Sequence, residues 1–185
     1  MADMQNTPKP DIMDAVRKFR TRFKNVGYVL IFLGVLAILF PLIFSIAAKT
    51  LLGWVFLLTG AAMLYHAFQS KEWQSAIWSG LIALMHIALG VYLGFFALTG
   101  LIGLTFFVGI AFLAQGAFEG MIAMQHRPKK GWGWLAFNGF ATLAMGTLLI
   151  AGLPSTALWA IGLLLGINFL TSGIAFVALA NAAGE

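Results

Sequence analysis

The sequence predicts an all-α membrane protein, with six transmembrane helices arranged as three tandem helical hairpins with pseudo-threefold symmetry. The first observation behind this prediction is composition. Of the 185 residues, 61% are hydrophobic and only 9% are charged, whereas soluble domains carry about 25% charged residues. A soluble fold of this length could not cover so much apolar surface, but a bilayer can surround it. The other two observations are six long apolar runs and an internal repeat.

Each apolar run approaches the roughly 20 residues that a helix needs to cross the hydrocarbon core. The runs cover approximately residues 26–44, 49–68, 76–96, 100–122, 134–151 and 156–180. Together they predict one transmembrane domain, residues 25–180, that follows a leader, residues 1–24, and precedes a short tail, residues 181–185.

The breaks between the runs alternate in charge, and this alternation predicts the orientation in the membrane. The basic set comprises the leader with Arg17, Lys18, Arg20, Arg22 and Lys24, the 69–75 loop with Lys71, and the 125–133 loop with Arg127, Lys129 and Lys130. The other set is short, and we expect Lys49 to be its only cation. Because Lys and Arg concentrate in cytoplasmic loops, both termini are expected in the cytoplasm of a multi-pass protein of the bacterial inner (plasma) membrane.

The end of the leader has the spacing of an amphipathic helix over residues 11–24. Its apolar side chains recur every three or four residues, at Ile12, Val16, Phe19 and Phe23, and the opposite face is basic. Such a helix suits a surface of anionic lipid, with its apolar side down. The alternative is a solvated cytoplasmic leader that carries only the charges that set topology.

The repeat is most visible in the second run of each predicted hairpin, which contains Gly-x-x-Phe-Leu-x-polar-Gly. The three copies begin at Gly53, Gly109 and Gly166 and end at Gly60, Gly116 and Gly173, offset by 56 and 57 residues. The first runs agree, because Gly34, Gly90 and Gly146 are spaced by 56 residues. The repeats therefore cover about residues 25–69, 76–125 and 132–180, and their common orientation is typical of repeats related by an axis along the membrane normal.

The six motif glycines are expected to pack helices together. Within each copy the two glycines are seven residues apart, so they lie on one helix face. Small residues let helices approach closely in lipid, where packing drives association. We therefore expect Gly53, Gly60, Gly109, Gly116, Gly166 and Gly173 at helix contacts. The polar motif residues, Thr59, Gln115 and Ser172, are expected to hydrogen-bond across those contacts.

These features resemble the HdeD family of bacterial acid-resistance membrane proteins. The resemblance rests on the tandem hairpins, the basic leader, the segment Gly-Val-Leu-Ala-Ile-Leu-Phe-Pro at residues 34–41 and the repeated glycine motif. It covers about residues 20–180. It implies a role in acid-stress resistance, and it carries over no catalytic residues.

Two ionisable side chains inside the spans are candidates for a response to pH. Glu119 is the only acid within a span and lies near the cytoplasmic end of its run, and His86 lies near the middle of another. An ionisable residue within the membrane is a functional hypothesis by default. The structural alternatives are that Glu119 reaches the interface or pairs with Arg127, and that a neutral His86 bonds to a neighbouring helix. Asn138 and Asn168 are expected to bond between helices.

The absence of several residue types and motifs excludes some classes of function. There is no Cys, the three His are not at metal-ligand spacing, and no nucleophile–base arrangement is visible, so we expect no metal, no cofactor and no enzymatic activity. The excess of Lys and Arg is the topology signal of a membrane protein, so we expect no nucleic-acid binding. The leading hypothesis is a non-enzymatic inner-membrane protein that contributes to acid-stress resistance. The alternative is a small transporter or channel for protons or small solutes. The expected partner is the lipid bilayer. Self-association and a membrane-protein partner both stay open.

Overall fold

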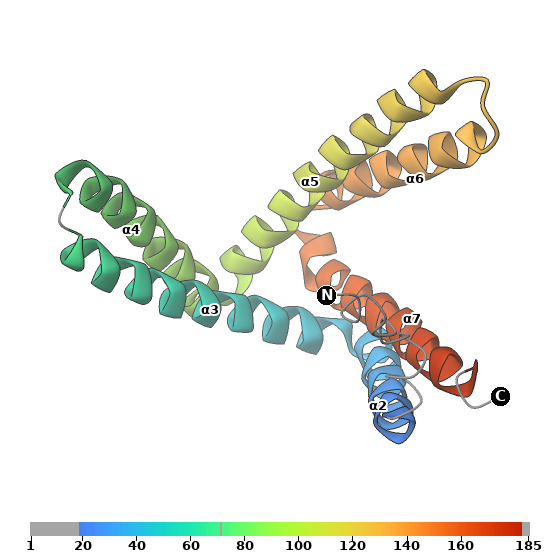
Figure 1. The fold of residues 1–185 in the computed structure, drawn as a ribbon, viewed down its shortest axis with the longest axis horizontal. Helices are drawn as coiled ribbons and strands as arrows, with labels where there is room; N and C mark the ends of the chain where they lie inside the picture. The colour runs from blue at the N-terminus through green and yellow to red at the C-terminus, as the bar shows by residue number, and fades with distance from the viewer. Residues whose placement is uncertain (1–18, 71, 183–185) are drawn as a thin grey trace, which may run out of the picture. The chain divides into compact units, whose positions relative to one another are not determined.

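The computed structural model describes residues 19–70 and 72–182, and over these residues the protein is entirely helical. In chain order the elements are α2 (Arg20–Leu39), α3 (Pro41–Gln69), α4 (Trp73–Phe95), α5 (Ala97–His126), α6 (Trp132–Ala151), the 3-10 helix η1 (Ser155–Leu158) and α7 (Ala160–Ala182). Figure 1 shows these elements along the chain. Within the described residues, six helices are long and apolar enough to cross a membrane. The predicted fold class, an all-α membrane protein with six spans, is confirmed.

The break between the first two spans lies earlier than predicted. The sequence placed it after residue 44, but α2 ends at Leu39 and α3 begins at Pro41, with only Phe40 between them. Proline has no N–H to donate and disfavours helical geometry in the residue before it, so it ends one helix. Its fixed φ suits the first turn of the next helix. The predicted outer loop near Lys49 is therefore part of α3.

Most of the predicted leader lies outside the described residues, and this includes residues 11–18 of the amphipathic segment. The last residues of that segment, from Arg20 to Lys24, form the first turns of α2 and continue directly into the span. The cations among them therefore belong to the end of a spanning helix.

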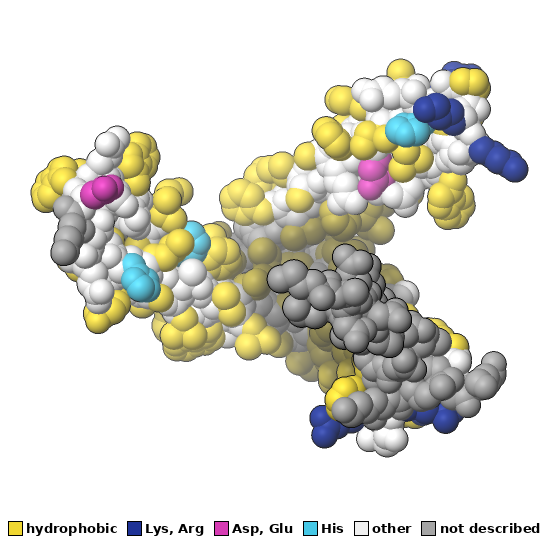
Figure 2. Space-filling model, in the orientation of Figure 1, with side chains coloured by type: hydrophobic (Ala, Val, Ile, Leu, Met, Phe, Trp, Pro, Cys, Tyr) yellow, Lys and Arg dark blue, Asp and Glu magenta, His cyan; other side chains and the backbone are white. Residues whose placement is uncertain are grey.

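The surface of the helices is apolar over most of their length. Phe32, Leu58, Met85 and Phe140 are among the large hydrophobic side chains that stay exposed, and Figure 2 shows many yellow hydrophobic side chains on the α3–α4 and α5–α6 hairpins. Soluble monomers rarely expose contiguous apolar areas of this extent. The exposed faces are suited to lipid.

The chain forms two compact units, Pro41–Gly162 and the two terminal segments Met1–Phe40 and Leu163–Glu185. The first, here called the central unit, contains the hairpins α3–α4 and α5–α6. The second, here called the terminal unit, contains α2 and most of α7. Figure 1 shows α3 beside α4 and α5 beside α6.

Glycines lie where the helices of the central unit meet. Gly53 on α3 contacts the backbone of Gly94 on α4, and a Cβ at Gly90 would lie 2.7 Å from the Leu57 backbone nitrogen. In the second hairpin, a Cβ at Gly116 would lie 2.6 Å from the Leu143 nitrogen. Side chains at these positions would collide with backbone, so each hairpin needs glycine to reach this separation.

The terminal unit repeats the same contact between α2 and α7. A Cβ at Gly34 would lie 2.9 Å from the Gly166 carbonyl oxygen, and one at Gly173 would lie 2.7 Å from the Gly27 oxygen. The structure thus places all six motif glycines at helix contacts. In each packed pair, the second helix of one sequence repeat contacts the first helix of another repeat. Thus α3 packs on α4, α5 packs on α6, and α7 of the third repeat packs on α2 of the first. The packed pairs are therefore offset by one helix from the sequence repeats.

Loop length explains this offset within the central unit. Only Phe96 separates α4 from α5, whereas residues 70–72 join α3 to α4 and residues 127–131 join α5 to α6. Antiparallel helices are joined by loops of about 2–5 residues. Gly131, with φ of 96°, supplies the left-handed turn before α6.

We expect Gly116→Leu to lower the thermal unfolding midpoint of the purified protein in detergent. The added side chain meets the α6 backbone, and overpacking of this kind costs about 1–3 kcal/mol or more. Gly120→Leu is the matched control, because a Cβ at Gly120 meets nothing within 4 Å. Equal midpoints for the two variants would show that α5 and α6 do not pack through Gly116.

Candidate functional site

Polar side chains inside the spans are few, and the buried ones gather in the central unit. Four polar residues are less than one-tenth exposed in the described part of the chain, namely Ser45, Lys49, Thr105 and Thr156. Ser45 and Lys49 lie in the first three turns of α3, Thr105 lies in the first three turns of α5, and Thr156 lies in η1. We call this set the buried polar cluster.

Lys49 is the most unusual member of the cluster, because its side chain is 1% exposed. The expectation that it lies in an outer loop is wrong. The cause is Pro41, which starts α3 two turns earlier and carries Lys49 into the helix. The lysine stem lies against Gly100 of α5, where an added Cβ would be 3.2 Å from Lys49 Cδ. The absence of a side chain at that position makes room for the lysine.

The Lys49 ammonium caps the end of α4. Its Nζ donates to the Phe96 carbonyl oxygen at 3.4 Å, and Phe96 is the C-cap residue of α4. A cation is favoured there by the helix dipole and by the unpaired carbonyls of the last turn. An ammonium has three donors, and no ion pair to a carboxylate is found for Lys49 within the described residues. This charge is therefore held by one long hydrogen bond.

The other members of the cluster differ in how fully they are bonded. The Gly162 amide, in the first turn of α7, donates to Ser45 Oγ at 2.8 Å. Thr156 Oγ1 donates to the Leu149 carbonyl at 2.7 Å. Thr105 Oγ1 has no hydrogen-bond partner in the described structure. The repeat offsets could have drawn attention to this region, because they align Lys49 with Thr105 and with Gly162.

Glu119 joins α5 to α6. Its Oε2 accepts from Asn138 Nδ2 at 2.6 Å, and its Oε1 accepts from Gln115 Nε2 at 2.9 Å. The expected pairing with Arg127 is not formed, because that guanidinium lies over the Trp132 ring, 4.8 Å from its centroid. The prediction that Asn138 bonds between helices is confirmed. Gln115, expected to bond across the contact, instead bonds along its own helix.

His86 lies half-buried on α4, apart from this carboxylate. Its Nδ1 is 2.8 Å from the Ile82 carbonyl oxygen of the same helix, and its ring lies 5.4 Å from that of Phe56 on α3. The expected bond to a neighbouring helix is therefore replaced by one within α4 and a ring contact to α3. The structure does not bring His86 and Glu119 together, because they belong to different hairpins.

The chemistry available to these groups is proton exchange and charge binding. Among the described residues, no group of three His, Cys, Asp or Glu side chains could hold a metal ion. Glu119 offers a carboxylate whose oxygens are both bonded to amides. Lys49 offers a buried ammonium. Both groups are single features that break the symmetry of the repeats.

We expect Lys49→Met to unfold at the same temperature as the parent protein or above it. Replacing a buried charge by a hydrophobic side chain of similar volume removes the cost of desolvating that charge. Lys49→Ala should instead destabilise by about 2–5 kcal/mol, because it leaves a cavity beside Gly100. Thermal unfolding in detergent measures both, with Lys24→Met as a control at a more exposed cation. A Lys49→Met protein no more stable than Lys49→Ala would show that the fold requires the ammonium itself.

Comparison with known proteins gives a family. A family model described as a short repeat of unknown function (DUF308) matches residues 26–95 and again residues 81–151. The two matches are shifted by nearly the interval of the glycine repeat. No curated protein and no solved structure matches the chain. Since the matched residues make up more than half of the chain, it belongs to the DUF308 family, which includes HdeD-like membrane proteins.

Proposed function

We propose that this protein is a non-enzymatic protein of the bacterial inner membrane that contributes to acid-stress resistance, with both termini in the cytoplasm. The resemblance to HdeD proteins, on residues 34–41 and the glycine motif, supports this role. The observation that carries it is the bond between Glu119 and Asn138. It places one proton-accepting group at a contact between two spanning helices.

Protonation of Glu119 would change the contact between α5 and α6. A carboxylate only accepts hydrogen bonds, and here each oxygen accepts one from an amide. A protonated Glu119 carries a donor on one oxygen, and that neutral hydroxyl oxygen is a weaker acceptor for its amide. The contact is therefore stronger with Glu119 ionised than with Glu119 protonated.

The surroundings of Glu119 favour access from the cytoplasmic side. The facing helix α6 contains no titratable side chain, and α5 adds only His126, whose Nδ1 is 2.9 Å from the Ile122 carbonyl oxygen. Beyond His126 lies the loop with Arg127, Lys129 and Lys130. A proton from an acidified cytoplasm has a short path from this loop to Glu119.

The charge distribution supports the proposed orientation. Cations gather at the start of α2 and between α5 and α6, where Figure 2 shows dark blue side chains. With Lys49 inside α3, the junctions at Phe40, at Phe96 and at residues 152–159 contain no Lys or Arg. The contrast between the two sets of breaks is therefore sharper than the sequence prediction assumed.

We expect Lys129→Cys to be protected, and Ser155→Cys to react, when cells with a permeabilised outer membrane are treated with a membrane-impermeant maleimide. The chain has no native Cys, so each variant reports one position. Lys129→Cys should react after the inner membrane is opened. The reverse pattern would overturn the cytoplasmic placement of the α5–α6 loop.

We expect Glu119→Gln to reduce survival in acid more than His86→Asn, at equal abundance of the two proteins. The amide introduced by Glu119→Gln cannot gain a proton, so this variant removes the proton-accepting group between α5 and α6. His86 bonds only within its own helix and contacts a ring, so its replacement should change survival less. The measurement is survival of cells that depend on this protein, and thermal unfolding of each variant excludes a general loss of fold. Survival equal to the parent for both variants would overturn the role of Glu119 as the proton-accepting group.

A second candidate function is transport of protons or small solutes, favoured by the buried Thr105 hydroxyl that has no partner in the described structure. The variants above separate the two functions when the purified protein is placed in liposomes. Flux that depends on pH and is lost with Glu119→Gln or His86→Asn supports transport. Liposomes without flux support a role that depends on the assembled helices.

A further inference from the structure

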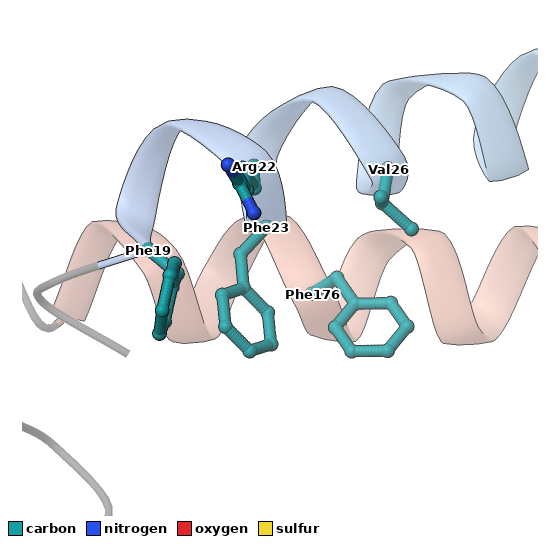
Figure 3. A pocket seen from close by; sticks show the side chains of 5 residues that line it. All are labelled: Phe19, Arg22, Phe23, Val26 and Phe176. Carbon is teal, nitrogen blue, oxygen red and sulfur yellow. The ribbon is translucent and has the colours of Figure 1, made fainter. Parts of the chain in front are cut away.

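The basic end of the α2–α7 pair carries an apolar groove. It has a volume of about 400 Å³ and is lined by Phe19, Arg22, Phe23, Val26 and Phe176. Figure 3 shows the three rings and Val26 projecting to the same side of the pair, with Phe176 from α7 and the others from the start of α2. The Phe23 and Phe176 ring centroids are 5.7 Å apart. The groove therefore runs along the place where two helices meet.

A cation is part of the lining of this groove. The Arg22 guanidinium carbon is 5.6 Å from the Phe19 ring centroid. Arg20, in contrast, already bonds to the last turn of α7, because its Nε donates to the Ala180 carbonyl at 3.0 Å. Within residues 19–40 and 163–182 there is no Asp or Glu, so the described part of the terminal unit provides no carboxylate for Arg22.

We propose that this groove binds an anionic phospholipid, with the phosphate at Arg22 and an acyl chain against Phe23, Val26 and Phe176. The two parts of the groove match the two parts of that molecule. Arginine pairs well with phosphate oxygens, and Phe23, Phe176 and Val26, which is one turn further along α2, offer an apolar wall. A soluble anion would leave the apolar wall unused, and an uncharged lipid would leave Arg22 unpaired.

The position of the groove along the helix fits the depth of a lipid. Arg22 lies in the first turn of α2, and Val26 lies one turn further into the span. Long basic side chains at the ends of spanning helices reach the headgroup region while their stems stay in the apolar layer. This inference rests on the proposed insertion of α2 into the membrane, and it is independent of the role in acid resistance.

The test is the retention of phosphatidylglycerol, against phosphatidylcholine, by the purified full-length protein in mild detergent, measured by native mass spectrometry. We expect preferential binding of phosphatidylglycerol, and about fivefold weaker binding for Arg22→Gln, in line with the contribution of one basic residue near an anionic surface. The matched control is Lys24→Gln, which removes the same charge two residues away and should change binding less. Phe176→Ala should also weaken binding, and Phe176→Leu serves if that variant does not fold.

Several outcomes would overturn the inference. Equal losses for Arg22→Gln and Lys24→Gln, without an effect at Phe176, would indicate diffuse attraction to a basic surface. Displacement of the lipid by inorganic phosphate alone would indicate a phosphate site. Equal retention of phosphatidylcholine and phosphatidylglycerol would show that the groove does not select an anionic headgroup. Because the measurement uses purified protein, its failure would leave the acid-survival result for Glu119→Gln unaffected.

Discussion

The structure depends on the close approach of helix backbones at paired glycines. Between spanning helices, burying an apolar side chain only exchanges lipid for protein, so association relies on packing and polar contacts. At Gly34 and Gly166, and at Gly90 and Gly53, a Cβ on either residue would meet the backbone of the other helix. Without that Cβ, the two backbones can approach each other to this separation. The remaining helix faces are left free to be apolar and to meet lipid.

This constraint explains why the sequence predicts the glycine contacts but not the partners. The motif glycines are seven apart on the second helix of each repeat, and Gly27 and Gly34, like Gly139 and Gly146, are seven apart on the first. Because the glycines have the same spacing on both helices, each second helix could pack on the first helix of its own repeat or of the next repeat. Chain connection decides between them in the central unit, because one residue at Phe96 gives α4 and α5 no loop in which to turn back side by side.

The polar residues were harder to predict, and Lys49 shows why. Hydropathy treats a lysine as a break in an apolar run, whereas Pro41 and the space beside Gly100 allow the same lysine to lie inside a helix and cap another one. The partner of Glu119 was missed for a related reason. Arg127 is closer in sequence and carries the complementary charge, but Asn138 faces the carboxylate across the α5–α6 contact. Residues that are close in sequence lie on the same helix or in the next loop, whereas these hydrogen bonds join two different helices.

The glycine framework also places different chemistry at one equivalent position in each pair. The repeat offsets align Glu119 with Met63 and Phe176, and align its partner Asn138 with Ile82 and Val26. The same place near the end of a helix pair thus holds a carboxylate–amide bond between α5 and α6, and the wall of an apolar groove between α2 and α7. Glycines that recur in all three pairs maintain the separation of the helices. Side chains that occur in only one pair can then differ without altering that separation, so the distinct activities of this protein are to be sought where the repeats differ.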